Sequence, residues 1–366
     1  MVRVGVLGVG QGHPSSSRRG VSLIRQLQAL PDVEVRAICD VDADALGVVQ
    51  REWAVPQAYT AMDELLAAPL DSVVIATPAP LHAAHAMAAL EAGKHVACEV
   101  PAASTLEECA ALASAARRSG RVYMLLENYR YLAFIESWRA MVENGLLGTP
   151  VYGEGEYVHD LRWQFLRSDG TRAWRADFPP IQYGTHALGP LLHVFGDRCI
   201  RAIGLGTGPR IDPRATASDM EVALFQLAGG GLLKVLCGFA VARDPKSSYY
   251  SLYGTKGFIE TVRDAEAGHP EACQAYLDAV PHGRGLMRLP LGSDHPVTKG
   301  ARPAWAAAGY PSRDHLVLEA FIQAVRDGTP PAIDLRRSLD FTAPCICAHL
   351  SAERGGVPVD VPEFAT

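Results

Sequence analysis

The sequence predicts an α/β protein: an N-terminal, doubly wound parallel sheet, followed by a C-terminal α/β domain with an open, mainly antiparallel sheet. Three observations lead to this prediction. Short strand-like and helical segments alternate over residues 1–125, as they do in a parallel sheet with crossover helices. After that point, strand-like segments follow one another with shorter connections. The length of 366 residues exceeds one ordinary hydrophobic core, which favours domains at 1–125 and 126–366.

The first three elements are predicted to form a βαβ unit. Residues 3–7 are a β-branched run that suits a buried strand, 21–30 have a helical pattern, and 33–39 suit a second strand. A glycine-containing turn joins the first strand to the helix. In such a unit the glycines let the backbone approach a pyrophosphate, and the helix N-terminus supplies free N–H groups.

A nucleotide would bind at this turn and at the end of the second strand. Asp40 ends that strand, where a carboxylate can accept a hydrogen bond from a ribose hydroxyl, and no arginine follows closely to bind a 2′-phosphate. His13 stands where the third glycine of the usual pattern belongs, and residues 11–19 look like an insertion. An ordinary surface turn is the alternative interpretation. We predict NAD rather than NADP, bound by Gly8, Gly10, Gln11 and Asp40.

The remaining elements of the first half continue the alternation of strands and helices. They are helices 43–53 and 62–67, strand 71–77, helix 82–92, strand 95–98, helix 105–119 and strand 122–126. The carboxyl ends of parallel strands share one edge of an open sheet, and ligands bind at that edge. Thr77 and Pro78, which end a strand, are therefore expected to face the cofactor.

The second half has the pattern of an antiparallel sheet. Strands are predicted over 151–159, 200–205, 220–227, 231–239 and 249–253, with a hairpin turn at 254–257 and a returning strand at 258–261. Residues 264–302 are rich in Pro and Gly and fit no element clearly. Helices are predicted over 133–143, 315–327 and 335–353, and the last two are expected to pack back onto the first domain.

Composition and charge exclude several classes of protein. The net charge of −6 leaves no basic surface for nucleic acid, and the longest apolar runs are too short to span a membrane. A strand begins at Val2, so we expect no signal peptide. The eight cysteines lack the spacing of metal sites and are expected as buried free thiols, which suits a reducing cytoplasm. A small molecule is the expected partner.

Five short motifs together resemble the Gfo/Idh/MocA family of oxidoreductases. They are Ala76-Thr77-Pro78 with His82, Glu99-Val-Pro101, Glu127-Asn128, Gly145-Leu-Leu-Gly148 and Gly254-Thr-Lys-Gly257. The resemblance covers nearly the whole chain and implies a Rossmann domain, a C-terminal α/β domain and NAD(P). It also implies a sugar-like substrate between the domains and a homodimer or homotetramer assembled through the sheets. The residues that this resemblance places at the cofactor are Thr77, Pro78, His82, Glu99, Pro101 and Asn128.

No metal site is predicted for this chain. The twelve histidines show no ligand spacing on one helix face, apart from His82 and His85 at positions i and i+3. Those two could in principle share a metal ion. The resemblance gives His82 a different place, at the cofactor edge, and we prefer that interpretation.

One position departs from the common dehydrogenases of this family. They carry Glu-Lys-Pro, in which the lysine helps to position or deprotonate the substrate hydroxyl, whereas this chain has Val100, which cannot accept a proton. A narrower resemblance accounts for the difference. Segments 99–103 with 107–109, then 157–162 and 183–190, resemble glycoside hydrolase family 109, the NAD-dependent α-N-acetylgalactosaminidases. Within the last segment, Gly184 and Ala187 stand where that family usually has Pro and Gly.

This narrower resemblance implies a redox-neutral reaction. NAD⁺ takes a hydride from C3 of the sugar, and the resulting ketone acidifies the proton on C2. A base removes that proton, the glycosidic oxygen leaves C1, water adds to the enone, and the hydride returns. Because the ketone supplies the activation, no pair of carboxylates at a fixed separation is required.

Four residues are candidates for the chemical steps. His186 is the leading candidate for handling the proton of the C3 hydroxyl, because a near-neutral histidine can accept a proton and return it within one cycle. A histidine buried in the core is the alternative. Tyr183 or Tyr131 could act at C2 or hold the substrate, although either could be a packing residue. Glu99 is expected to bind the nicotinamide ribose or the substrate.

The polar segment after residue 158 is a candidate for substrate binding. His159, Asp160 and Arg162 follow an apolar strand and could contact the sugar or form a structural ion pair. Trp174 and Arg175, with further arginines nearby, could form a pocket for an anionic or acetamido substituent. They could also contact the nicotinamide, or belong to a solvated loop.

Three classes of function remain open on the sequence. An NAD-dependent glycoside hydrolase is favoured by Val100 and the three motifs of the narrower resemblance. A simple NAD-dependent sugar or cyclitol dehydrogenase is the alternative, and net production of NADH would identify it. A non-catalytic protein that binds the cofactor would show NAD binding without turnover.

Overall fold

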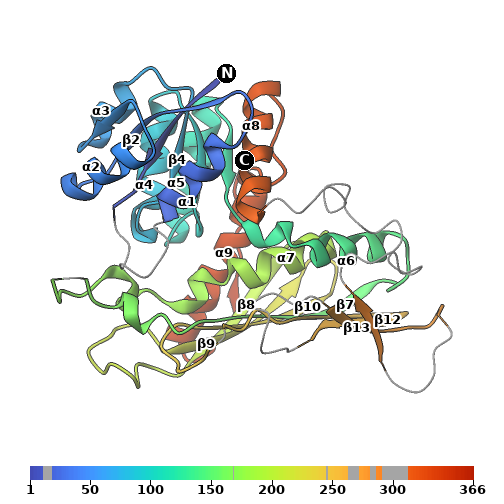
Figure 1. Cartoon of the computed structure of the whole chain (residues 1–366). Helices are drawn as coiled ribbons and strands as arrows, with labels where there is room; N and C mark the ends of the chain where they lie inside the picture. The colour runs from blue at the N-terminus through green and yellow to red at the C-terminus, as the bar shows by residue number, and fades with distance from the viewer. Residues whose placement is uncertain (11–18, 168, 245, 263–271, 281–285, 291–311) are drawn as a thin grey trace.

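Two β-sheets, the second seen edge-on below the first in Figure 1, form the frame of the chain. The computed structural model describes residues 1–10, 19–167, 169–244, 246–262, 272–280, 286–290 and 312–366. The first sheet is parallel and the second is mostly antiparallel, so the predicted fold class is confirmed.

The first sheet contains six parallel strands in the order β3-β2-β1-β4-β5-β6. They are β1 (Val2–Leu7), β2 (Val33–Cys39), β3 (Gln57–Tyr59), β4 (Ser72–Ile75), β5 (His95–Cys98) and β6 (Tyr123–Leu125). This is the strand order of dinucleotide-binding folds, in which ligands bind at the carboxyl edge near the switch point between β1 and β4. Strand β3 was not predicted, because it has only three residues and none of them is buried.

Helices connect these strands as the sequence predicted. They are α1 (Arg19–Gln28), α2 (Ala43–Glu52), α3 (Met62–Ala67), α4 (His82–Glu91) and α5 (Leu106–Ser119). Helix α5 shows why the sequence defines its ends so well. The Thr105 hydroxyl accepts from the backbone N–H of Glu108, whose carboxylate accepts from the N–H of Ser104. Gly120 ends the helix in the left-handed conformation, at φ +61°.

The second sheet contains nine strands in the order β14-β13-β12-β11-β7-β10-β9-β8-β15. They are β7 (Pro150–Val158), β8 (Cys199–Gly206), β9 (Met220–Leu227), β10 (Leu232–Gly238), β11 (Tyr250–Gly254), β12 (Gly257–Thr261), β13 (Ala272–Leu277), β14 (Met287–Pro290) and β15 (Val359–Asp360). Neighbouring strands are antiparallel except β7 and β10. Strands β13 and β14 lie in the segment that fitted no element on sequence alone.

Helices α6 (Ala133–Glu143), α7 (Thr185–Phe195) and α9 (Leu335–Glu353) lie on the side of this sheet that faces the first one (Figure 1). Helix α7 was not predicted, because Gly189 and Pro190 hide its helical pattern. Thr185 to Val194 are all buried. Helix α7 therefore lies in the interior between the two sheets, and any polar side chain on it needs a partner.

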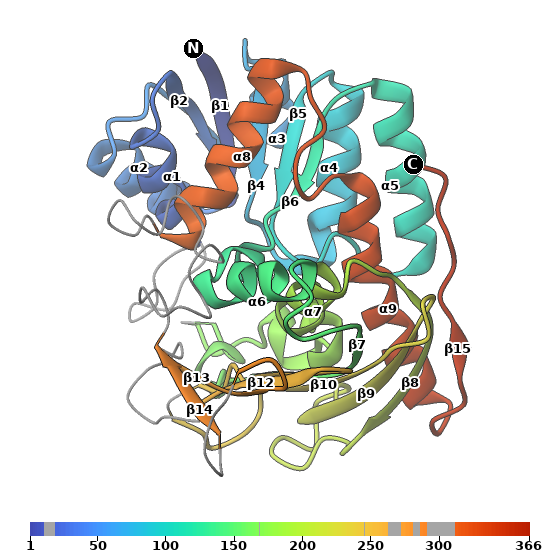
Figure 2. The ribbon, with the colours of Figure 1, turned by 90° about the vertical axis from the view of Figure 1, so that its right-hand side faces the viewer.

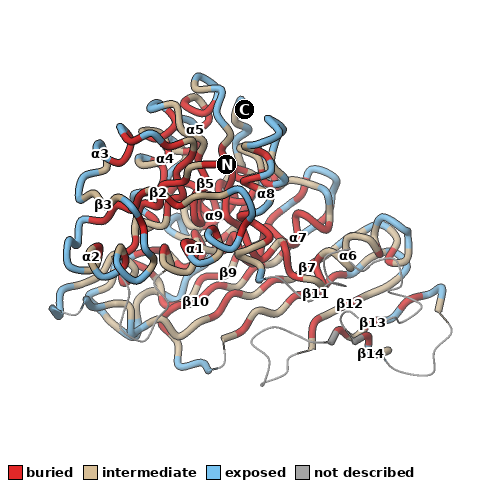
Figure 3. The backbone as a smooth tube through the Cα atoms, turned by 45° about the horizontal axis from the view of Figure 1, so that its top comes forward, coloured by how far each residue is buried: buried red, intermediate tan, exposed pale blue. Residues whose placement is uncertain are grey.

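Helices near the C-terminus return to the first sheet. Helix α8 (Arg313–Asp327) lies beside α1 (Figure 2). Side chains of helix α9 accept hydrogen bonds from the backbone of the first sheet and its connections. The N–H of Leu125 donates to Ser338 Oγ, and that of Ala102 donates to Thr342 Oγ1, each at 3.2 Å. Figure 3 shows the buried backbone continuing through both sheets and these helices.

The cysteines and short helical turns complete the fold. All eight cysteines are free and buried, as predicted. No helix in the described part of the chain combines the length and apolar character that a membrane span needs. Among the described residues, five 3₁₀ turns shape the connections: η1 (Ala79–Leu81), η2 (Asn128–Tyr131), η3 (Arg162–Gln164), η4 (Trp174–Asp177) and η5 (Pro180–Tyr183).

Candidate active site

The glycine turn after β1 lies against the ends of β2 and β4. Gly8 has φ +96°, and a Cβ there would lie 2.7 Å from backbone atoms of Ala76 and Thr77. Asp40 Oδ2 accepts from the backbone N–H groups of Val9 at 2.7 Å and of Gly10 at 2.6 Å. The structure therefore brings together the glycines and the strand-end carboxylate that were predicted to bind the cofactor.

The third glycine of the dinucleotide pattern is Gly20. It lies in the first turn of α1, and a Cβ there would lie 2.0 Å from the carbonyl oxygen of Gly8, so only glycine permits this close packing of helix and turn. The assignment of this place to His13 is therefore wrong. The insertion separates the glycines in sequence but leaves Gly20 in contact with the turn. The predicted contact of Gln11 lies outside the described residues.

His82 joins two segments of the carboxyl edge. Its Nδ1 lies 2.8 Å from the carbonyl oxygen of Pro101, and its Nε2 lies 2.8 Å from that of Thr77. Burial lowers the pKa of His82, so the neutral ring donates to one of these two oxygens. His85 Nδ1 lies 3.0 Å from the hydroxyl of Thr77. No group of three metal-binding side chains is found among the described residues.

Arg19 is clamped between two carboxylates at the start of α1. Its guanidinium lies 2.6 Å from Glu99, which follows β5, and 2.5 Å from Asp314 on α8. The Asn128 amide also donates to Asp314, at 2.6 Å. These contacts join Glu99 and Asn128, both predicted at the cofactor, to α1, the helix that follows the glycine turn. Neither Arg19 nor Asp314 was predicted.

The charges of this clamp are partly buried. Burial raises the pKa of Glu99, while the Arg19 charge opposes that rise. Burial also works against ionisation of Asp314, but there the Arg19 charge outweighs it and the pKa lies below the usual range. A fixed guanidinium thus keeps charge on both sides of the cofactor edge.

His186 and Glu127 form a buried pair between the two sheets. His186 Nδ1 lies 2.7 Å from Glu127 Oε1, and the two residues are 6% and 0% exposed. Glu127 follows β6, and His186 lies in the first turn of α7. Because the carboxylate accepts from Nδ1, the Nε2 atom is the one that can exchange a proton with a ligand. The second carboxylate oxygen, Oε2, has no hydrogen-bond partner among the described residues.

Three tyrosine rings surround His186. The ring of Tyr129 stacks on it at 4.4 Å between centroids, Tyr157 lies at 4.9 Å and Tyr183 at 5.4 Å. Burial raises the pKa of Tyr157 and of Tyr183, so both phenols stay protonated at neutral pH. The Tyr250 hydroxyl donates to the backbone carbonyl of His186 and fixes the start of α7.

Tyr131 lies apart from these rings in the described contacts. It is buried, and the guanidinium of Arg130 lies over its ring at 4.8 Å. Tyr129 from the same 3₁₀ turn is the residue that stacks on His186. Both tyrosines belong to the same 3₁₀ turn, and Tyr129 is the ring of that turn that the structure places against His186.

The segment after β7 divides into a part near His186 and a part at the surface. The ring of His159 lies 4.4 Å from that of Tyr157, which is one of the three tyrosines around His186. Asp160 and Arg162 instead pair with each other at 2.6 Å, with both side chains partly exposed. Trp174 and Arg175 stack together at 4.4 Å, and Arg175 also lies over the ring of Tyr183 at 5.1 Å.

Sequence reasoning missed several residues of this site. Glu127 had a signal, since it is a carboxylate directly after a buried strand at the ligand edge of the sheet. Tyr157 lay inside a quoted motif, but its role depends on the strand register. Arg19 and Asp314 are far apart in the sequence, so only tertiary structure could pair them.

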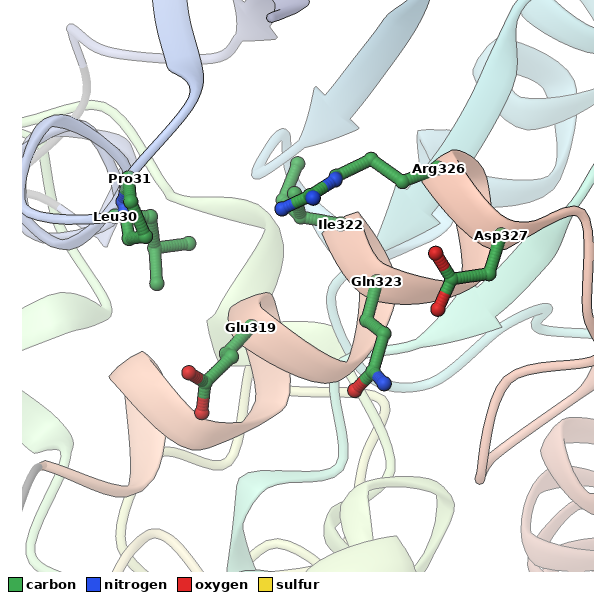
Figure 4. Close-up of a pocket in the computed structure, with 7 residues that line it drawn as sticks. All are labelled: Leu30, Pro31, Glu319, Ile322, Gln323, Arg326 and Asp327. Atoms are coloured by element: carbon green, nitrogen blue, oxygen red, sulfur yellow. The ribbon is translucent and has the colours of Figure 1, made fainter.

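A surface hollow of about 190 Å³ lies between α8 and the end of α1 (Figure 4). Its lining residues are Leu30, Pro31, Glu319, Ile322, Gln323, Arg326 and Asp327. Leu30 and Pro31 precede β2, so the hollow lies at the amino edge of the sheet. Ligands of open α/β sheets bind at the opposite edge.

The fold and the cofactor edge define an NAD-binding oxidoreductase architecture. The family model described as "Oxidoreductase family, NAD-binding Rossmann fold" matches residues 2–127. Among solved structures, levoglucosan dehydrogenase in complex with NADH superposes with a TM-score of 0.80 at 21% identity, covering 99% of this chain and all of that one. NAD is the cofactor, as predicted.

Curated relatives narrow this class. A glycosyl hydrolase family 109 protein of Streptomyces filamentosus is 30% identical, over 99% of this chain and 77% of that protein. An α-N-acetylgalactosaminidase of Bacteroides fragilis is 26% identical, over 100% of this chain and 92% of that protein. The chain belongs to glycosyl hydrolase family 109 within the Gfo/Idh/MocA oxidoreductases.

Proposed function

We propose that this chain is an NAD-dependent glycoside hydrolase that cleaves a sugar glycoside by transient oxidation at C3, elimination across C1 and C2, addition of water and re-reduction. The observation that carries the proposal is the buried pair of His186 and Glu127 among three tyrosines, at the cofactor edge. Bound NAD would supply the reversible removal and return of the hydride at C3.

His186 is the group that moves the proton of the C3 hydroxyl. Glu127 holds its Nδ1 at 2.7 Å and stabilises positive charge on the ring, so that Nε2 can accept the hydroxyl proton and return it at the end of the cycle. Val100 is fully buried, so its side chain packs in the core and leaves this task to His186.

A tyrosine is the base proposed for the C2 proton. Tyr157 and Tyr183 lie beside His186, with ring centroids 6.0 Å apart, whereas the described contacts of Tyr131 lie elsewhere. Burial raises the pKa of Tyr183, and the Arg175 charge opposes that rise, so Arg175 lowers the cost of the phenolate form that would accept the C2 proton. Glu99 would hold the nicotinamide ribose or the sugar, and His159, stacked on Tyr157, would contact the substrate.

A sugar or cyclitol dehydrogenase is the second candidate function. It is favoured by the same histidine–glutamate pair, because a proton acceptor at the oxidised hydroxyl is all that net dehydrogenation requires. The two functions differ in the fate of the hydride, which stays on the cofactor in a dehydrogenase.

The deciding experiment follows nitrophenol and NADH together. Purified protein is incubated in D₂O with NAD⁺ and a panel of nitrophenyl α- and β-glycosides. The glycosidase predicts nitrophenol release with catalytic NAD⁺, no accumulating NADH and deuterium at C2 of the sugar. Stoichiometric NADH with a ketosugar would establish the dehydrogenase, and NAD⁺ binding without either product would leave only a cofactor-binding protein.

The second sheet supports a proposal for assembly. Large apolar side chains are exposed on its strands, among them Leu224, Leu232, Tyr253 and Tyr276. On β9, exposed Leu224 lies between buried Ala223 and Phe225, which places it on the opposite face of the sheet. We expect a homodimer or homotetramer formed through this face. Light scattering on Leu224→Lys and wild type would test it, since a wild-type monomer contradicts the proposal.

A further inference from the structure

The connection between β7 and α7 carries four arginines, and two of them pair with carboxylates. Arg162 pairs with Asp160 at 2.6 Å. Arg172 pairs with Asp177 at 2.8 Å and with Asp212 at 2.7 Å. These guanidinium groups therefore hold the connection in shape, and they have their carboxylate partners within the protein.

Arg175 differs from these arginines. No ion pair in the described part of the chain includes it. Its guanidinium carbon instead lies over three aromatic rings: Trp174 at 4.4 Å, Tyr183 at 5.1 Å and Phe239 at 5.7 Å. Aromatic faces hold a guanidinium through its flat surface, so the N–H groups of Arg175 that are not directed at the Tyr183 hydroxyl can donate to a planar acceptor.

Arg175 is also close enough to act on the chemical groups. The Tyr183 ring beneath it lies 5.4 Å from His186. Burial raises the pKa of Tyr157 and of Tyr183, and the Arg175 charge opposes the rise in both. An acceptor bound to Arg175 would therefore lie beside the sugar carbons on which His186 and the tyrosines act.

Nearby carboxylates are already committed elsewhere. Glu99 pairs with Arg19 at 2.6 Å, and Glu127 accepts from His186 at 2.7 Å. The charge of Arg175 therefore has no described protein anion to meet it. A guanidinium without a carboxylate partner can bind an anionic ligand through charge-assisted, bidentate hydrogen bonds.

We propose that Arg175 binds the carboxylate of a uronic acid unit, so that the substrate is an anionic glycoside. This inference rests on the proposed function and specifies its substrate class. A carboxylate matches the bidentate fork of the guanidinium, whereas a hydroxymethyl group at the same carbon offers a single uncharged oxygen. The aromatic rings around Arg175 suit stacking on the sugar.

The test compares matched substrates on matched variants. Nitrophenyl glucuronide and galacturonide are compared with the corresponding glucoside and galactoside, on wild type, Arg175→Gln and Arg167→Gln, which removes an exposed charge from the same connection. We expect wild type to prefer a uronide. Arg175→Gln should lower kcat/KM for the uronide roughly 10- to 100-fold more than it lowers kcat/KM for the neutral analogue. Arg167→Gln should behave as wild type.

Binding is measured separately from turnover. Calorimetry on the NAD⁺-loaded protein compares glucuronate and galacturonate with glucose and galactose, and also gives the NAD⁺ affinity of each variant. Uronide-dependent NADH accumulation without nitrophenol would support the inference while refuting the glycosidase. The inference is overturned if wild type binds and turns over the neutral sugars as well as or better than the uronides. It is also overturned if Arg175→Gln loses NAD⁺ affinity by the same factor as it loses turnover. The absence of binding or turnover for all sugars would overturn it as well.

Discussion

Two of the histidine–glutamate pairs lie near the segment that leads into α7, one of them buried and the other partly exposed. His186 contacts Glu127 at 2.7 Å, and His349 on α9 contacts Glu221 on β9 at 2.9 Å. The pairs are chemically alike, but their surroundings differ. Three tyrosine rings and the cofactor edge adjoin the first pair, whereas Glu221 also accepts from the backbone N–H of Ile181. The proposal therefore assigns a catalytic role to the first pair and a structural role to the second from their positions, and not from the presence of the pair alone.

The largest expected effect comes from breaking the first pair at its histidine. His186→Asn removes the group proposed to exchange the C3 hydroxyl proton, and we expect kcat to fall roughly 10³-fold. NAD⁺ affinity and the thermal unfolding midpoint should stay close to wild type. The measurement is steady-state kinetics with the glycoside that the panel identifies. A variant that retains more than about a tenth of the activity would contradict the assignment of the proton-transfer step to His186.

A smaller effect is expected at the glutamate of the same pair. Glu127→Gln preserves the shape of the side chain but removes the charge that holds His186 in one tautomer, so we expect kcat to fall roughly 10²-fold. Glu221→Gln is the matched control, because it makes the same change in the second pair. If kcat falls equally in the two variants, both pairs affect turnover only by stabilising the folded protein.

A third variant tests the clamp that joins α8 to the cofactor edge. Asp314→Asn removes one of the two carboxylates that pair with Arg19. It also removes the charged acceptor of the Asn128 amide. We expect the Kd for NAD⁺ to rise roughly 3- to 10-fold, as measured by calorimetry. Asp327→Asn at the other end of α8 is the control. A lower thermal unfolding midpoint with unchanged NAD⁺ affinity would show that the clamp serves only the fold.

The smallest effect is expected in the second pair and depends on pH. Burial lowers the pKa of His349, but the hydrogen bond to Glu221 outweighs it, so the pKa lies above its usual value. The stabilisation is therefore present in full below the unfolded pKa of about 6.5 and is lost as the pH rises through the folded value. His349→Asn should cost about 1 kcal/mol of unfolding free energy at pH 6 and less at pH 8.5.

Denaturant unfolding of wild type and His349→Asn at the two pH values measures this difference. Turnover of His349→Asn should remain near wild type, because His349 contacts β9 and α9 residues and lies outside the tyrosine group. A constant difference across the pH range would show that the pair is not charged in the folded state.

Much of the parallel sheet was predictable because its signals are local. Helix α5 has its cap and its terminal glycine within one continuous segment, and the strands that it connects are short and apolar. Helix α7 was missed because its local signal is weak. Gly189 and Pro190 interrupt the helical pattern, and burial on all sides keeps the segment helical. The hairpin at Gly254 and Gly257 was predicted from its turn residues and is present.

The sequence by itself determined the fold class and the cofactor and gave His186 as a candidate, because strand alternation, glycine spacing and short motifs are written in consecutive residues. Tertiary structure decided the rest. It showed that Gly20 packs against Gly8, that Glu127 holds His186, and that Arg19 meets Asp314. It also placed Asp212, 40 residues away in the chain, against Arg172. Contacts between residues far apart in the chain depend on how whole elements pack, which no local pattern encodes.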